Sequence, residues 1–120
     1  MVLRWPLRSV EERRDGVLIL ILTGRISAES APQLRAALAG VLGRGDVRLV
    51  LDLTGVDYIS SAGLQVLEEA AALCAGGAGA LALCGVVHAV KIAIDLGGLT
   101  SQILMEPSRE SAIARVSAPN

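Results

Sequence analysis

The chain has 120 residues, a formal net charge of −1 and an apolar fraction of 52%. This length fits one domain with a substantial core, and the near-neutral charge argues against a protein that binds nucleic acid through its phosphates. The basic residues are scattered, and their densest group, Arg4 to Arg14, also contains Glu11 and Glu12, which is typical of a solvated charged edge.

The composition also restricts the kind of core that the chain can build. Phenylalanine is absent, and Trp5 and Tyr58 are the only aromatic residues. The core must therefore consist of Leu, Val, Ile and Ala. Such a core is typical of an α/β protein, in which β-branched strands lie under helices rich in Ala and Leu.

Cysteine usage and the N-terminus indicate the compartment. Cys74 and Cys84 lie in surroundings rich in Ala and Leu, without the spacing of a zinc site, and we expect them to be buried free thiols. The opening MVLRWPLR lacks the apolar centre of a signal peptide. We therefore expect a protein of the reducing cytoplasm.

One uncharged stretch, Ala70 to Val90, is long enough to span a bilayer. Its centre is the glycine-rich segment 76–79, and its apolar residues are mostly Ala, which drives membrane insertion only weakly. The stretch is better interpreted as a helix end, a glycine turn and a buried strand. We expect no membrane insertion.

In chain order, the hydrophobic pattern predicts five strands and four helices. A charged first strand containing Pro6 is expected at a sheet edge, and a turn at 13–16 leads into a continuous apolar run typical of a central strand. Ser30 is the expected cap of the first helix, and Gln33 completes a capping box. The expected strands cover residues 2–10, 17–23, 47–53, 80–84 and 102–105, and the expected helices cover residues 30–42, 61–74, 88–96 and 108–116.

This order predicts an α/β fold with a mixed sheet of about five strands surrounded by about four helices. Strands that are separated by helices pair in parallel through crossovers, whereas the first two strands can form an antiparallel hairpin. We expect a single domain over residues 1–120, with its core at about 10–116.

The signatures of common enzyme classes are missing from the sequence. No Gly-Lys-Ser/Thr phosphate loop is present, and Ile59 stands where a serine-hydrolase elbow before Ser61 needs glycine. His88 is the only imidazole, and a lone histidine beside an apolar helix is more typical of a structural role. Asp52 resembles a receiver-domain aspartate, but Lys91 is the only lysine and no acidic pair follows the first buried strand. We expect no enzyme activity, no cofactor and no metal site.

The most informative segment is LVLDLTGVDYISSAGLQVL at residues 49–67, which predicts a strand, a loop and a helix. Ser61 lies at the expected helix N-terminus, where unpaired N–H groups and the helix dipole favour a phosphate. The simpler interpretation is that Ser61 is an ordinary N-cap, worth about 1 kcal/mol. Gly63 favours the functional interpretation, because glycine costs about 1 kcal/mol in a helix and leaves the backbone around Ser61 unshielded.

The segment 51–67 resembles the signature of STAS domains, especially that of bacterial anti-sigma factor antagonists. The upstream LTGRISAESAPQL at 22–34 resembles the strand-to-helix segment of that family, and Asp95-Leu-Gly-Gly-Leu99 resembles its usual helix exit. The resemblance covers roughly residues 10–116, which is nearly the whole chain.

The resemblance implies a partner-switching function in transcription regulation. In the family, the unphosphorylated antagonist binds an anti-sigma factor that is also a GHKL-type serine kinase, and the sigma factor is released. The kinase phosphorylates the antagonist at the position of Ser61, which ends binding, and a PP2C-type phosphatase resets the switch. Ser60 is a possible competing acceptor.

Two positions depart from the family pattern. Ser60 stands where Asp usually precedes the acceptor, and Ser27 replaces an acidic residue after Gly24-Arg25-Ile26. The resemblance nevertheless implies a partner-binding surface around the Arg25–Ser30 loop and the Asp57–Gly63 loop. Its expected residues are Arg25, Ser27, Asp57, Tyr58, Ser60, Ala62, Gly63 and Leu64.

Two other functions remain open for a domain of this family. One is a subunit that docks on a lipid or solute transporter without being phosphorylated. The other is a scaffold subunit in a large signalling assembly.

Overall fold

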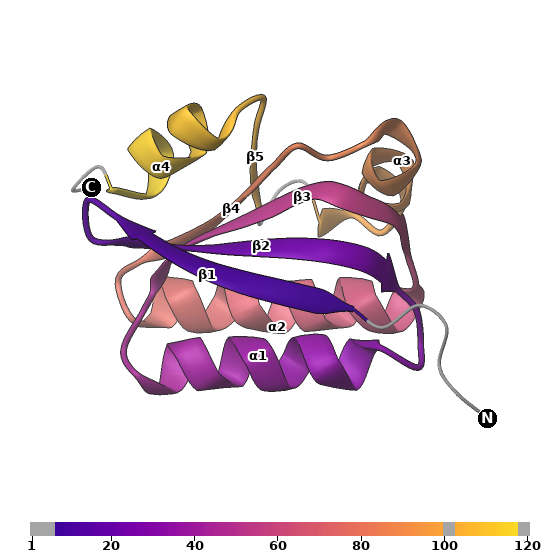
Figure 1. The fold of residues 1–120 in the computed structure, drawn as a ribbon, viewed down its shortest axis with the longest axis horizontal. Helices are drawn as coiled ribbons and strands as arrows, with labels where there is room; N and C mark the ends of the chain where they lie inside the picture. The colour runs from indigo at the N-terminus through magenta and orange to yellow at the C-terminus, as the bar shows by residue number, and fades with distance from the viewer. Residues whose placement is uncertain (1–6, 100–102, 118–120) are drawn as a thin grey trace.

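The computed structural model describes residues 7–99 and 103–117, and Figure 1 shows how they are arranged. The strands are β1 (Arg8–Arg14), β2 (Val17–Ile26), β3 (Arg48–Ile59), β4 (Ala80–Cys84) and β5 (Leu104–Glu106). The helices are α1 (Ala31–Gly43), α2 (Ser61–Gly76), α3 (His88–Leu96) and α4 (Arg109–Ser117).

The strands form one five-stranded sheet in the order β1-β2-β3-β4-β5. β1 runs antiparallel to β2, and the pairs β2–β3, β3–β4 and β4–β5 are parallel. The predicted mixed sheet, with an N-terminal hairpin followed by helix-connected parallel strands, is confirmed.

The bounds of four predicted strands need correction. The second strand runs to Ile26 instead of ending at residue 23. The first strand covers Arg8–Arg14 instead of residues 2–10, and positions 1–6 lie outside the described residues. The hairpin turn is confined to Asp15 and Gly16, with φ of 55° and 77°, which suits a tight two-residue connection. The third strand runs on to Ile59 instead of ending at residue 53, because its last residues continue to pair with β2.

β5 also differs from its predicted bounds, since it covers Leu104–Glu106 instead of 102–105. Residues 100–102 lie outside the described residues.

The core lies on both faces of the sheet, because side chains alternate along each strand. Leu18, Leu20 and Leu22 of β2 point into the larger cluster, which is covered by α1, α2 and α3. Val17 and Ile19 point into a smaller cluster under α4. Figure 1 shows α1 and α2 side by side below the sheet and α4 above it. The apolar runs in the sequence are therefore strands buried on both faces.

Both cysteines are free and buried, as predicted. Cys74 lies in the larger cluster and Cys84 in the smaller one. Burial raises the pKa of each thiol to about 11, so both remain protonated and unreactive at neutral pH.

None of the helices in the described part of the chain has the length and apolar character that a membrane crossing requires.

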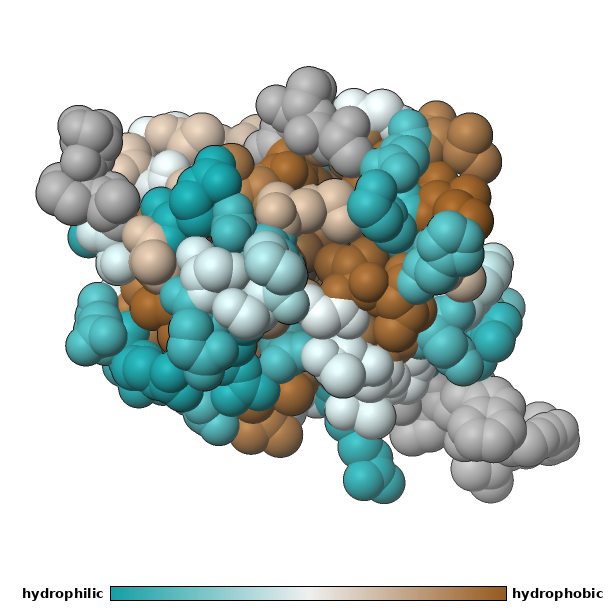
Figure 2. All heavy atoms as spheres, turned by 90° about the horizontal axis from the view of Figure 1, so that it is seen from above, coloured by the Kyte–Doolittle hydropathy of each residue, from teal (hydrophilic) through white to brown (hydrophobic). Residues whose placement is uncertain are grey.

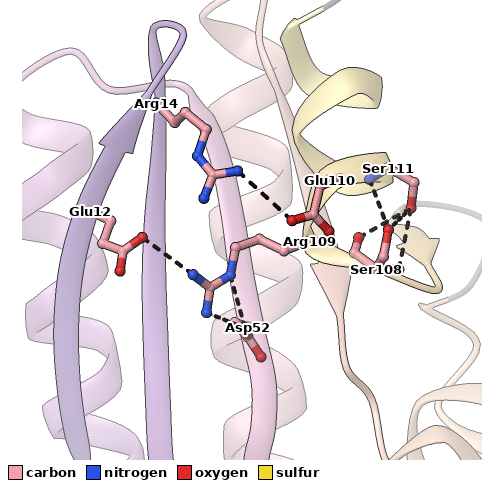
Figure 3. A network of polar contacts seen from close by, with 7 residues as sticks. All are labelled: Glu12, Arg14, Asp52, Ser108, Arg109, Glu110 and Ser111. Carbon is pink, nitrogen blue, oxygen red and sulfur yellow. Dashed lines mark hydrogen bonds and ion pairs between the residues drawn. The ribbon is translucent and has the colours of Figure 1, made fainter.

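Ion pairs attach β1, in which every residue is exposed, to both helical layers. Glu11 contacts Arg44 and Arg13 contacts Asp46, both at 2.8 Å, near the end of α1. On the other face, Arg109 of α4 lies between Glu12 and Asp52 (Figure 3), with distances of 3.2 Å and 2.8 Å.

Asp52, which resembles a receiver-domain aspartate in the sequence, therefore has a structural role in the fold. Burial alone would raise the pKa of its carboxyl group, but hydrogen bonds from the Thr54 hydroxyl and backbone N–H, and then from Arg109, outweigh burial and lower it. The side chain joins the middle of β3 to the first residue of α4. Ser108 caps that helix, since its hydroxyl accepts a hydrogen bond from the Ser111 N–H at 3.0 Å.

Replacing Arg109 with methionine should test this connection. The substitution keeps aliphatic packing but removes the hydrogen bonds to buried Asp52, and we expect it to lower the free energy of unfolding by about 2 kcal/mol. Urea denaturation at pH 7 measures the effect. Arg35→Met is the control, because Arg35 pairs with Glu69 on the surface and its loss should cost less than about 1 kcal/mol.

The same pair of variants predicts a pH dependence. The pKa of Asp52 is lower in the folded than in the unfolded chain, so its stabilising contribution is present above the unfolded value of about 4. It is lost as the pH falls through the folded pKa. The stability difference between wild type and Arg109→Met should therefore narrow below pH 4, and a constant difference down to pH 2 would contradict this account.

Candidate functional site

The candidate site lies at one end of the sheet, where the inner strands β2 and β3 finish together. Ile26 pairs with Ile59 at the last position of the two strands, and the backbone N–H of Ser60 donates to the Ile26 carbonyl at 2.7 Å. Each strand then leads toward a helix. Figure 1 shows that the α1 and α2 starts lie side by side at this end of the molecule, and that α3 lies at the same end, higher in the view.

The two adjacent serines at the start of α2 have different roles. Ser60 is the N-cap, and its hydroxyl accepts a hydrogen bond from the Gly63 N–H at 3.1 Å. Ser61 is the first residue of the helix and is exposed. The interpretation of Ser61 as an ordinary cap is therefore wrong. No side-chain hydrogen bond of Ser61 occurs within residues 7–99 and 103–117.

Gly63 has a packing role, which corrects the reason given for it from the sequence. The residue is buried against the ends of β2 and β3. A methyl group on its Cα would lie 2.5 Å from Cγ2 of Ile26 and 2.8 Å from Cγ1 of Ile59. The glycine thus allows α2 to approach the two strand ends closely, and it does not expose backbone to a partner.

The loop before α1 is also fixed by internal hydrogen bonds. The Ser30 hydroxyl donates to the Arg25 carbonyl at 2.7 Å and accepts from the Ser27 N–H at 2.9 Å. Its side chain makes no cap bond to the helix, so the predicted capping box with Gln33 is wrong. Ser27 faces the same network, since its hydroxyl accepts from the Ser30 N–H at 3.2 Å. These bonds hold the backbone of Arg25 in place.

Arg25 and Tyr58 form an exposed pair at the site. The guanidinium of Arg25 lies 4.4 Å from the centre of the Tyr58 ring, a cation–π contact, and 40% of Tyr58 is exposed. In the part of the chain that the structure describes, Arg25 makes no ion pair with a carboxylate. The pair thus presents a positioned positive charge to solvent.

An open hollow of about 500 Å³ lies beside this pair, on the sheet extension beyond β4. It is shallow and partly polar, unlike the enclosed apolar cavities that take most small ligands. The lining residues are Thr23, Gly24, Arg25, Thr54, Gly55, Val56, Asp57 and Val87.

The structure brings most of the predicted contact residues to one surface. Arg25, Asp57, Tyr58 and Ser61 are exposed. Ala62 and Leu64, in the first turn of α2, are partly exposed, as are Ser27 and Ser60. Gly63 is the buried exception.

The contribution of α3 could not be seen from the residues singled out in the sequence. Val87 before this helix lines the hollow, and Gly97 after it lies against Leu64 of α2. The sequence did carry one signal, because the apolar residues Ile92 and Leu96 lie four positions apart. In the structure both side chains are exposed, whereas Val90 and Ile94 are buried.

His88 is exposed at the start of α3. Within the described ranges, no three side chains among His, Cys, Asp and Glu are grouped so that they could hold a metal ion.

Comparison with known proteins places these features in a family. A model described as the STAS domain matches residues 9–112. The chain is 39% identical, over 103 residues, to BtrV of Bordetella bronchiseptica, which is described as a candidate anti-sigma factor antagonist. The match spans 86% of this chain and 89% of BtrV.

Two solved structures have closely similar folds. An anti-sigma factor antagonist from Mycobacterium paratuberculosis has a TM-score of 0.80 and 26% identity, over 93% of this chain and 95% of that protein. The Thermotoga maritima protein tm1081, described as a candidate anti-sigma factor antagonist, has a TM-score of 0.85 and 20% identity. It matches 92% of this chain and 95% of its own length, and at this identity the likeness concerns the fold alone.

The two serines should respond differently to truncation. Ser60→Ala removes the cap bond to Gly63 and should lower the free energy of unfolding by about 1 kcal/mol. Ser61→Ala removes an exposed hydroxyl and should change it by less than about 0.5 kcal/mol. Chemical denaturation measures both values, and equal losses from the two variants would contradict the assignment of the cap to Ser60.

Gly63 gives a second test of this geometry. Gly63→Ala should destabilise the fold by about 1 to 3 kcal/mol, because the added methyl group overlaps Ile26 and Ile59. Gly40→Ala is the matched control, since Gly40 lies within α1 and nothing is within 4 Å of its added methyl group. There, the gain in helix propensity should stabilise the protein by up to about 1 kcal/mol. Thermal unfolding of both variants shows the opposite signs, and stabilisation by Gly63→Ala would refute the close packing.

Proposed function

Because the chain belongs to the STAS domain family, we propose that it is an anti-sigma factor antagonist, a protein that binds an anti-sigma factor and so releases a sigma factor. The proposal is supported by the similarity to BtrV and to the Mycobacterium paratuberculosis protein over most of each chain. Its action is binding, and it is not an enzyme. We propose that the protein acts in the cytoplasm, where sigma factors act.

The finer proposal is that phosphorylation of Ser61 switches this binding off. The observation that carries it is the exposed Ser61 hydroxyl at the first position of α2, next to a cap supplied by Ser60. A phosphoryl group adds a charge of about −1.5 to −2. At a helix N-terminus that charge interacts favourably with the dipole, so the fold itself tolerates it.

The cap bond also favours Ser61 over Ser60 as the acceptor. The Ser60 hydroxyl already contacts the Gly63 N–H, and its residue is only partly exposed. A kinase would have to break the cap bond to reach it. Ser61 requires no such opening.

The docking surface that we propose consists of the exposed groups around Ser61. Arg25, stacked on Tyr58, offers a cation to an acidic group of the partner, while Ala62 and Leu64 offer apolar contacts. Asp57 lies at the rim of the hollow. Ser27, Ser60 and Gly63 act beneath this surface by fixing the two loops.

The partner in this proposal is an anti-sigma factor that is also a GHKL-type serine kinase. A phosphate on Ser61 would have to be desolvated in the interface and would repel acidic groups that face Arg25. A PP2C-type phosphatase would then remove the phosphate and restore binding.

Substitutions at Ser61 test the switch. Ser61→Asp should weaken binding to the anti-sigma factor kinase about 100-fold, which corresponds to about 3 kcal/mol of coupling. Ser61→Ala should retain binding but incorporate no phosphate when kinase and ATP are present. Isothermal titration calorimetry measures affinity, and mass spectrometry locates the phosphate.

Ser9→Asp is the control, because it adds the same charge to an exposed serine on β1. It should leave the affinity unchanged. Tight binding by Ser61→Asp, or phosphate on Ser60 in the wild-type protein, would refute the switch at Ser61. Co-purification with a transporter ATPase, or a very high native mass, would support the transporter subunit or the scaffold instead.

A further inference from the structure

Helix α3 exposes apolar side chains that its own fold does not use. Val90 and Ile94 are buried in the core, whereas Ile92 is 45% exposed and Leu96 is 84% exposed. Residues four positions apart lie on the same side of a helix, so Ile92 and Leu96 form a continuous strip. Figure 2 shows the molecule from above, with apolar side chains gathered at the end where α3 lies. We call Ile92 and Leu96, with Leu64 at their border, the α3 patch.

The α3 patch adjoins the docking surface at both ends of the helix. Val87, just before α3, lines the hollow together with Arg25 and Asp57. At the other end, a methyl group on Gly97 would lie 3.2 Å from Cδ1 of Leu64, which belongs to the first turn of α2. Because Ser61 belongs to that same turn, the patch and the proposed phosphorylation site form one surface.

The electrostatics of α3 favour an uncharged contact. Lys91 and Asp95, each one position before a residue of the strip, form the neighbouring row of the helix and pair with each other at 3.0 Å. This pair satisfies both charges within the helix. A partner that covers the strip therefore meets neither an unmatched lysine nor an unmatched carboxylate, and apolar side chains suit it best.

The size of the α3 patch decides between possible occupants. A stable dimer buries about 800 Å² on each partner, far more than two exposed aliphatic side chains provide. A second copy of this chain is therefore a poor occupant for the patch alone. As part of the larger docking surface, the same side chains can act as an apolar anchor.

We propose that the α3 patch is the apolar anchor of the anti-sigma factor interface, and that Leu96 inserts among apolar side chains of that partner. This inference rests on the proposed function. It assigns two separate tasks to one surface. The α3 patch supplies affinity, and the charge state of Ser61 determines whether that affinity can be used.

A matched pair of leucine variants tests the anchor. Leu96→Ser should weaken binding to the anti-sigma factor kinase that phosphorylates Ser61 by about tenfold. Leu73→Ser is the control, because Leu73 is 60% exposed but lies in the last turns of α2, about 18 Å along the helix from Ser61. Its affinity should change less than about twofold. Calorimetry gives both affinities, and circular dichroism confirms that both variants fold.

The outcomes separate this inference from the proposed function. Equal affinities for Leu96→Ser and the wild type, with Ser61→Asp still impaired, would overturn the anchor and leave the switch intact. A self-associated wild type that Leu96→Ser converts to monomer, without a change in kinase affinity, would assign the patch to a second copy and also overturn the anchor. Failure of the wild type to bind any anti-sigma factor would defeat the proposed function, and the anchor with it.

Discussion

The candidate functional site depends on the pairing of β2 with β3 beyond the point where β4 ends. β4 has only five residues, whereas β3 has twelve and pairs with β2 as far as Ile26 and Ile59. The Ser60 N–H continues this ladder by donating to the Ile26 carbonyl. Both chain segments that leave the sheet here therefore start from a rigid base, and the first turn of α2 packs on the same two isoleucines through Gly63.

This base explains why two adjacent serines can have different roles. The first backbone N–H groups of a helix have no partner within the helix and need acceptors from outside it. The extended backbone of Ser60 places its hydroxyl where it accepts from the Gly63 N–H. Ser61, one position later, is then left without a structural task. Charge added at Ser61 changes the surface that a partner meets while the cap and the ladder stay in place, so an electrostatic switch requires no refolding at this site.

Much of the fold could be predicted because the central strands are apolar and α1, α2 and α3 end at or beside glycines. The end of β3 could not, because the segment Thr54-Gly55-Val56-Asp57-Tyr58 is mostly exposed and polar, and its strand geometry comes from pairing with β2. The cap was assigned to the wrong serine because Ser60 and Ser61 are equally good caps by residue type. The roles of Asp52 and Gly63 also depend on distant partners, Arg109 and Ile26, which no local pattern specifies.

The arrangement of the layers separates the ion pairs that hold α4 from the proposed docking surface. Figure 1 shows α4 at one end of the sheet and α3 at the other. Arg109 attaches α4 to Asp52 and Glu12, and these contacts do not involve the helix starts around Ser61. The proposed docking surface instead gains its order from short local contacts, such as the hydrogen bond from Ser30 to the Arg25 carbonyl and the stacking of Arg25 on Tyr58. Because these groups are already in place in the free protein, a partner loses little conformational entropy in ordering them. In the proposed switch, this free energy of contact responds to the charge on Ser61.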